Sequence, residues 1–188
     1  MYLFLDIGGT NTKIGISRNL KNLDSFYKVN TPYEYKDFLV LIKGFLNNKK
    51  FKKVIIGFAG MVENGKILKA PNLPSFDNKN LKRDLEKIFS SEVIVKNDAE
   101  FAGLGEATFG AGKNYKILGY ITWSTGIGGA KIVNKKIEDN FFGFEPGHSL
   151  FLISPYNIFS NKIYFEEIEK ILGGRSIGKF FDRKPEEI

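Results

Sequence analysis

The protein has 188 residues, of which 43% are hydrophobic and 26% charged, which predicts a soluble globular protein of one large or two small domains and excludes disordered, collagen-like and coiled-coil chains. The 28 Lys and Arg residues exceed the 21 Asp and Glu residues by 7, but they are scattered among Asn, Phe and Ile, which favours a solvated surface over a nucleic-acid partner. Cysteine is absent and histidine occurs once, so disulfides and thiolate metal sites are excluded.

Signals for membrane insertion and export are missing from the sequence. It has no uncharged apolar run long enough to span a bilayer. The first residues, Met1 to Asp6, lack the basic lead of a signal peptide and reach an acidic residue early. We therefore expect no membrane partner and a cytoplasmic location.

The first part of the chain predicts a mixed α/β layer that starts with a hairpin. Apolar periodicity predicts strands at 2–7, 12–17, 25–31, 54–58 and 93–95, and helices at 34–48, at 81–89 and after residue 98. Asn78 or Asn80 is the expected cap of the helix at 81–89. Residues 60–76, rich in Gly, Pro and Asn, predict a long loop.

A second cycle follows, with strands at 116–123 and 129–134 joined by a glycine turn. This strand–turn–strand unit repeats the topology of residues 2–17 without repeating their sequence. We expect a boundary near 110–112, which divides the chain into 1–110 and 111–188. A last helix is predicted over 163–181, interrupted at Gly173 and Gly174.

Two glycine turns are candidate phosphate-binding loops, because glycine lets several backbone N–H groups approach one anion. The first lies within Asp6-Ile7-Gly8-Gly9-Thr10-Asn11-Thr12-Lys13, and the second within Ser124-Thr125-Gly126-Ile127-Gly128-Gly129. Asp6 could hold a metal-bound water, and Lys13 could point outward or toward a phosphate. Each turn alone could be an ordinary hairpin turn, but the pair favours a nucleotide held between two clamps.

Four polar segments are candidates for chemistry on a second ligand. Asp98, where a buried strand meets a helix, could be a general base with Asn97 binding a neighbouring hydroxyl, or Asp98 could simply cap the helix. Glu145 and His148 could bind sugar hydroxyls, or could be a loop glutamate and a structural histidine. The loops at 57–60 and 71–74 are ambiguous in the same way.

In this order, the segments DIGGTNTKIG, GFAGMVENGKI, APNLP, NDAEFAGLGEATFGAG, STGIGGA and FEPGH resemble the ROK family of sugar kinases and repressors. The resemblance covers essentially the whole chain. It implies an α/β, actin-like/hexokinase-like ATPase fold (a ribonuclease H-like motif), with residues 1–110 as the N-terminal lobe and 111–188 as part of the C-terminal lobe.

The resemblance implies an ATP-dependent kinase of glucokinase type, active in glycolysis, that transfers the γ-phosphoryl group to a hexose hydroxyl, usually the 6-hydroxyl. Asp98 would be the catalytic base, and ATP would bind with Mg²⁺. The implied sugar ligands are Gly60, Asn72, Asn97, Asp98, Glu145, His148 and Glu169. The implied nucleotide-binding residues are Asp6, Gly8, Gly9, Thr10, Asn11, Thr12, Lys13, Thr125, Gly126 and Gly128.

Three departures from the family qualify this expectation. The cysteine segment that binds zinc in many members is missing near residues 160–168, so zinc is not expected. No helix-turn-helix precedes Met1, which disfavours the repressor branch. The chain is shorter than family members, and an incomplete second lobe should expose apolar surface and favour association, so a homo-oligomer stays open. The alternative to a kinase is a sugar- or nucleotide-binding protein without catalytic activity. A third hypothesis, an acetate-kinase-like or actin-like ATPase of the same fold, agrees less well with the sequence because of the FEPGH segment.

Overall fold

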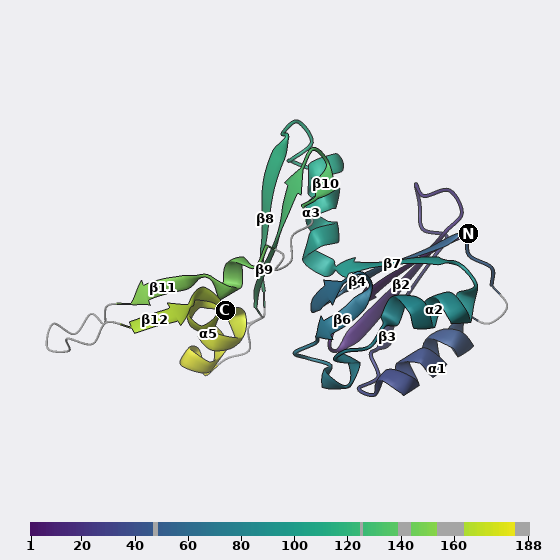
Figure 1. The fold of residues 1–188 in the computed structure, drawn as a ribbon, viewed down its shortest axis with the longest axis horizontal. Coiled ribbons are helices and arrows are strands. Elements are labelled where there is room, and N and C mark those ends of the chain that lie inside the picture. Colours follow the sequence, from purple (N-terminus) through teal and green to yellow (C-terminus); the bar gives the residue numbers. More distant parts are fainter. Residues whose placement is uncertain (47–48, 125, 139–143, 154–163, 183–188) are drawn as a thin grey trace, which may run out of the picture. The chain divides into compact units, whose positions relative to one another are not determined.

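The structure is a computed structural model that describes residues 1–46, 49–124, 126–138, 144–153 and 164–182. The chain divides into two compact units, Met1–Phe101 and Ala102–Ile188 (Figure 1). The assignment of two lobes that meet near residue 110 stays a prediction. Among the described residues, no helix is both long and apolar enough to span a membrane.

The first unit is built on a five-stranded sheet in the order β3-β2-β1-β4-β7. The strands are β1 (Tyr2–Ile7), β2 (Asn11–Ser17), β3 (Ser25–Asn30), β4 (Lys53–Phe58) and β7 (Glu92–Asn97). β1, β2 and β3 pair antiparallel, whereas β4 is parallel to both β1 and β7. All five predicted strands are confirmed, with small shifts of their ends.

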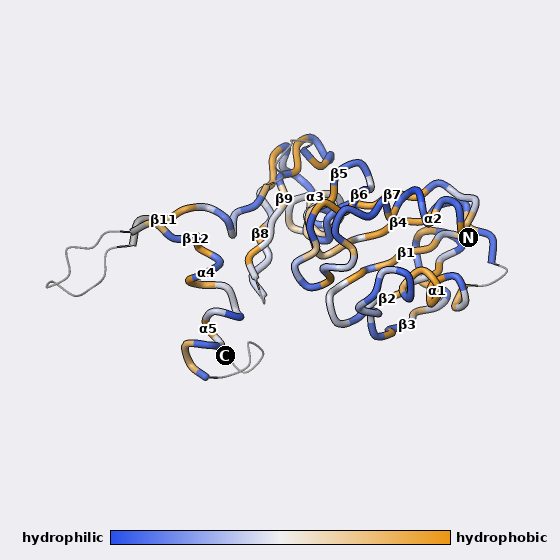
Figure 2. The backbone as a smooth tube through the Cα atoms, turned by 60° about the horizontal axis from the view of Figure 1, so that its bottom comes forward, coloured by the Kyte–Doolittle hydropathy of each residue, from blue (hydrophilic) through white to orange (hydrophobic). Residues whose placement is uncertain are grey.

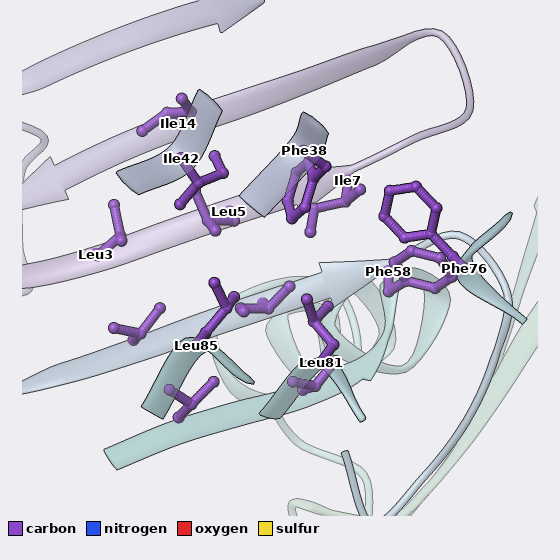
Figure 3. Close-up of a cluster of buried hydrophobic side chains, with 14 of the residues drawn as sticks. Leu3, Leu5, Ile7, Ile14, Phe38, Ile42, Phe58, Phe76, Leu81 and Leu85 are labelled. Carbon is purple, nitrogen blue, oxygen red and sulfur yellow. The ribbon is translucent and has the colours of Figure 1, made fainter. Parts of the chain in front are cut away.

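Helices α1 (Tyr35–Phe45) and α2 (Leu81–Phe89) pack against this sheet. β1 alternates buried and half-buried residues, and its buried side chains meet Phe38 of α1 and Leu85 of α2 in one core (Figure 3). Both β1 and β4 carry hydrophobic residues along their length (Figure 2). Burial of such side chains contributes roughly 1.5–3 kcal/mol each. Asn80 caps α2, since its side chain accepts the N–H of Arg83 at 3.0 Å.

The prediction of an irregular loop over 60–76 was wrong. The segment contains a hairpin of β5 (Met61–Glu63) and β6 (Lys66–Lys69), followed by the short 3-10 helix η1 (Pro74–Phe76). Asn64 and Gly65 form its turn with φ of 49° and 80°. An Asn-Gly pair favours such a two-residue turn, so the signal was present in the sequence.

Helix α3 (Asp98–Thr108) begins with a reciprocal cap. The side chain of Asn97 accepts the N–H of Ala99 at 2.8 Å, and Glu100 accepts the N–H of Asn97 at 3.1 Å. This is a capping-box arrangement, in which the side chain of the residue before the helix accepts a backbone N–H of the first turn, and the side chain of the third helical residue accepts the backbone N–H of the capping residue. Asn97 is therefore the cap, and Asp98 is the first residue of the helix.

The second unit contains a three-stranded sheet in the order β10-β9-β8. Its strands are β8 (Ile117–Trp123), β9 (Ile127–Val133) and β10 (Lys136–Ile137). Ala130 and Ile132 of β9 pack with Ala107 of α3 in a small core. One face of β8 is open: Ile117, Ile121 and Trp123 are 64%, 61% and 63% exposed.

The last elements are η2 (Pro146–His148), β11 (Leu150–Ile153), β12 (Tyr164–Glu167), α4 (Ile168–Leu172) and α5 (Gly174–Phe181). The predicted interruption at Gly173 is confirmed, because this residue separates α4 from α5. The helix predicted over 163–181 was wrong for residues 164–167, which form β12 and pair antiparallel with β11. That pairing partner is distant in the sequence, so local periodicity could not identify it.

Candidate functional site

The sheet of the first unit brings three separate segments to one edge. Ile7 of β1 pairs with Phe58 of β4, and Phe58 pairs with Asn97 of β7. Because the three strands are parallel, the chain leaves all of them at the same edge, where ligands bind in open α/β sheets. The first glycine turn, the 59–60 segment and Asp98 therefore follow these strands at one place.

Asp98 lies in an environment that favours its neutral form. The residue is exposed overall, but protein atoms packed around its carboxyl group desolvate it, and this desolvation raises its pKa. The negative charge of Asp6 raises the pKa further, while the N–H of Ala99 (2.9 Å) and the charge of Lys13 lower it. A carboxylate with a raised pKa holds an accepted proton better, which suits a general base.

Asp6 and Lys13 form a cross-strand ion pair near Asp98. They are direct partners in the β1–β2 register, and the Lys13 ammonium donates to the Asp6 carboxylate at 2.7 Å. This hydrogen bond is the main reason that the pKa of Lys13 is raised. Both side chains are about half exposed, at 53% and 48%. The Lys13 ammonium thus lies beside acidic groups, and whether it faces a phosphate stays a prediction.

The first glycine turn is held in place from two sides. The N–H of Gly8 donates to the Asn11 carbonyl at 3.0 Å, and the Thr31 hydroxyl donates to the Gly8 carbonyl at 2.8 Å. A Cβ at Gly9 would lie 2.5 Å from the Cβ of Asn72, so glycine alone permits this approach. The structure thus brings Gly9 and Asn72, predicted for different ligands, into contact.

Thr10 and Thr12 differ in exposure, and only Thr10 is accessible from outside. The Thr10 carbonyl accepts the N–H of Thr31 at 2.9 Å, and the residue is exposed. Thr12 is fully buried, and its hydroxyl bonds that of Thr31 at 2.8 Å. Thr31 was missed by the sequence analysis, because its position at the end of the strand predicted over 25–31 gave no sign that it supports the turn.

Asn97 connects β7 with the segment after β4. Its amide nitrogen donates to the Gly60 carbonyl at 3.0 Å, while its amide oxygen caps α3. A Cβ at Gly60 would lie 2.5 Å from the Lys69 carbonyl oxygen, so this segment also requires glycine. The structure brings Asn97 and Gly60 together beside Asp98, as two of the predicted sugar ligands.

In the second unit, the predicted glycine turn is shorter than expected. β9 starts at Ile127, and the Ser124 N–H donates to the Gly126 carbonyl at 2.9 Å, which leaves a tight turn between β8 and β9. Gly128 lies within β9, paired with Thr122. Thr125 is outside the described residues. The N–H of Ile127 already has a partner, the Glu169 carboxylate at 2.6 Å.

His148 is part of an acidic cluster at η2 and β12. Its Nδ1 lies 3.0 Å from the Glu167 carboxylate, and this hydrogen bond raises the pKa of His148 and lowers that of Glu167. The negative charges of Glu145 and Glu169 also raise the pKa of His148, which places all three acids near the ring. Sequence reasoning missed Glu167, because only the β11–β12 pairing brings it to the histidine.

The structure thus assembles two sets of predicted residues, one in each unit. The first contains Asp6, Lys13 and Asp98 with the Gly9–Asn72 and Gly60–Asn97 contacts, and the second contains Gly126, Glu145, His148 and Glu169. No group of three or more His, Cys, Asp or Glu side chains that could hold a metal occurs in the described part of the chain. Carboxylates such as Asp6 and Asp98 nevertheless fit Mg²⁺ that arrives with a nucleotide, since that ion uses only one or two protein carboxylates besides phosphate oxygens and water.

Comparisons with known proteins give one consistent relationship. The family model described as the ROK family matches residues 2–157. The chain is 33% identical over 152 residues to a glucokinase of Streptomyces coelicolor, which covers 77% of this chain and 48% of that protein. It is 33% identical over 144 residues to an N-acetyl-D-glucosamine kinase of Citrobacter koseri, covering 72% of this chain and 47% of that protein.

The fold is also that of solved structures. A ROK family glucokinase from Streptomyces griseus, in complex with glucose and AMPPNP, matches with a TM-score of 0.74 and 29% identity over 95% of this chain and 59% of that one. The likeness confirms the α/β, actin-like/hexokinase-like ATPase fold. The chain spans about half the length of the curated relatives it matches.

Proposed function

Because the chain belongs to the ROK family, we propose that it acts as an ATP-dependent sugar kinase of glucokinase type, which transfers the γ-phosphoryl group of ATP to a hexose hydroxyl. The observation that carries this proposal is the place of Asp98. Its carboxyl group is desolvated, and it stands at the edge where β1, β4 and β7 end, near the Asp6–Lys13 pair.

The sugar is proposed to bind through polar groups beside Asp98 and through the polar cluster around His148. Asp98 accepts the reacting hydroxyl, Asn97 and Gly60 flank it, and Asn72 lies against the first glycine turn. In the second unit, Glu145, His148 and Glu169 are proposed to bind further hydroxyls. Clustered carboxylates and an imidazole suit this role, because sugar hydroxyls both donate and accept hydrogen bonds.

The nucleotide is proposed to bind at the glycine turns. Gly8, Gly9, Thr10 and Asn11 belong to the turn at the end of β1, while Lys13 supplies a positive charge near the acids. Thr12 takes part through its backbone, since its side chain is buried. Thr125, Gly126 and Gly128 complete the proposed set. Mg²⁺, held beside Asp6, would neutralise phosphate charge when bound.

Asp98 prepares the sugar for the transfer. The hydroxyl proton moves to the Asp98 carboxylate, and the hydroxyl oxygen attacks the γ-phosphorus atom of ATP. The bond between that phosphorus and the bridging oxygen breaks, and ADP leaves with the electron pair. Phosphoryl transfer depends mainly on such positioning and on charge stabilisation.

An ADP-release assay with glucose, mannose, fructose, N-acetylglucosamine and N-acetylmannosamine tests the proposal. We expect sugar-dependent ADP release with at least one hexose, and its loss by about 10²-fold or more in Asp98→Asn. The matched control is Asp37→Asn, which removes an exposed carboxylate from the first turn of α1. Unchanged turnover in Asp98→Asn would contradict the base role, and sugar-induced thermal stabilisation without ADP release would favour a non-catalytic binding protein.

The same proposal sets the partners and the setting of the protein. A small-molecule sugar and ATP are the proposed ligands, with no nucleic acid or membrane partner. Glucose phosphorylation would place the protein in the cytoplasm at the entry to glycolysis. Association of identical chains is proposed below from the exposed strand β8.

A further inference from the structure

Backbone pairing brings His148 and Glu167 together. Leu150 of β11, two residues after the histidine, lies opposite Glu167 of β12 in the antiparallel register. The N–H of Ile168 donates to the Ser149 carbonyl at 3.0 Å, which extends this pairing by one more hydrogen bond. The contact of 3.0 Å between Nδ1 of the ring and the Glu167 carboxylate therefore stands on a hydrogen-bonded backbone.

The Glu167 carboxylate has a separate partner on each of its two oxygens. Oε2 bonds Nδ1 of His148, and Oε1 lies 3.6 Å from the Lys170 ammonium. Lys170 belongs to α4 and also pairs with Glu166 at 3.1 Å. Partners at both oxygens restrict the rotation of the carboxyl group, so the ring that bonds to it has a preferred orientation.

The same bond decides which ring nitrogen carries the hydrogen atom. Its bond to the ring lowers the pKa of Glu167, so at neutral pH the carboxylate is ionised and can only accept. A neutral imidazole has one N–H and one lone pair, and the hydrogen bond at one nitrogen sets the role of the other. Nδ1 of His148 therefore carries the hydrogen, and Nε2 of the neutral ring keeps the lone pair.

We propose that Glu167 is a positioning residue for sugar binding, an inference that rests on the proposed function. It holds His148 in the orientation and tautomer in which Nε2 accepts a hydrogen bond from a sugar hydroxyl. Glu167 acts through the ring and does not itself bind the sugar, which agrees with side-chain exposures of 30% for Glu167 and 60% for His148. Without Glu167 the ring turns and exchanges tautomers, and the free-energy cost of ordering it falls on sugar binding.

Three acids from different elements act on the charge of the ring. The hydrogen bond to Glu167 of β12 is the largest cause of the raised pKa of His148, and the charges of Glu145, which precedes η2, and Glu169 of α4 add to it. Any change at Glu167 therefore also changes the pKa of the ring. The variants are compared at a pH at which an NMR titration shows a neutral ring in each, so that only orientation and tautomer differ.

The first measurement is the tautomer of the ring. The sequence has one histidine, so every imidazole signal in the nitrogen NMR spectrum of an isotope-labelled sample belongs to His148. We expect the Nδ1–H tautomer in the wild type and in Glu167→Gln, whose amide oxygen still accepts, and a mixture of tautomers in Glu167→Ala. Glu166→Gln is the matched control, since Glu166 bonds Lys170 from the same strand, and it should leave the tautomer unchanged.

The second measurement is sugar affinity, by titration calorimetry with glucose and N-acetylglucosamine at the same pH. We expect Glu167→Ala to weaken binding about fivefold or more, and Glu167→Gln and Glu166→Gln to stay close to the wild type. In the ADP-release assay, KM for the sugar should rise in Glu167→Ala while kcat stays nearly unchanged, because a lost ground-state contact has this signature. In a His148→Ala background, Glu167→Ala should have no further effect, since its action passes through the ring.

The outcomes distinguish this inference from the proposed function. If no sugar binds and no ADP is released, the proposed function fails, and the positioning role fails with it. If sugar binds and turns over but Glu167→Ala binds it as tightly as the wild type, only the positioning role is overturned. An equal loss of affinity with and without His148 would mark a structural effect and also overturn it, as would a wild-type ring with its hydrogen at Nε2.

Discussion

Single residues at the site show a conflict between stability and chemistry, and Asp98 is the clearest case. Desolvation raises the pKa of Asp98, with Asp6 adding to the shift. The unfolded chain releases the Asp98 proton at the ordinary pKa, and the folded chain only at a higher pH. Below the ordinary pKa this group therefore does not oppose folding. As pH rises through the pKa of the folded state, the carboxyl group ionises in its desolvated place and the stability of the folded state falls.

Asp98→Asn should consequently be more stable than the wild type at neutral pH, because it removes an ionised group from a desolvated place. The melting temperature, followed from about pH 4 to about pH 7, should show a difference in favour of the variant that grows with pH. A variant that melts below the wild type throughout this range would contradict the expected sign.

Asp77 offers the opposite case. The bonds from Lys69 and from the N–H of Ala70 hold its pKa below the usual range. Its contribution to stability is present above the ordinary pKa and is lost as pH falls. Asp77→Asn should thus lower the melting temperature at neutral pH, and the deficit should shrink in acid.

At the scale of elements, the glycine turn between β1 and β2 depends on its contact with the segment after β6. Gly9→Ala would place a Cβ 2.5 Å from that of Asn72, so either the turn or Asn72 must shift. We expect destabilisation of about 1–3 kcal/mol, measured by urea unfolding, together with weaker nucleotide binding.

Gly44→Ala is the control for this change. Gly44 lies in α1, and nothing is within 4 Å of the Cβ that alanine would add. Alanine there should stabilise the protein by about 0.5–1 kcal/mol, because glycine weakens helix interiors. Equal effects of the two substitutions would mean that the Gly9 contact has no role of its own.

On the scale of the whole molecule, the open face of β8 is the feature with a consequence for assembly. β8 is the edge of its sheet in the described chain, with Ile117 and Ile121 exposed on it. Edge strands with exposed apolar side chains promote association. We expect Ile117→Lys with Ile121→Lys to reduce concentration-dependent association, measured by sedimentation velocity.

Val40→Lys is the matched control, because Val40 is 71% exposed on helix α1 of the other unit. It should leave the sedimentation profile unchanged. Association that is as strong in the double variant as in the wild type would show that β8 is not the contact surface.

Much of the fold could be predicted from sequence, because it is written in local patterns. Alternation in β1 and β2, the apolar run of β4, and the helical spacing of α1 and α2 each arise from neighbouring residues. The β5–β6 hairpin could also be predicted from Asn64-Gly65, but its strands are too short to show an alternating hydrophobic pattern. Strand β12 was not readable, since its pairing with β11 overrides local preference.

The sequence by itself determined the family, and it pointed to the candidate site residues: the glycine turns, Asp98 and the polar segment around His148. Only the tertiary structure decided their partners, such as Lys13 for Asp6, Glu167 for His148 and Ile127 for Glu169. The physical reason is that strand register and helix placement, which depend on packing between distant segments, set which groups meet and hence the pKa that each one has.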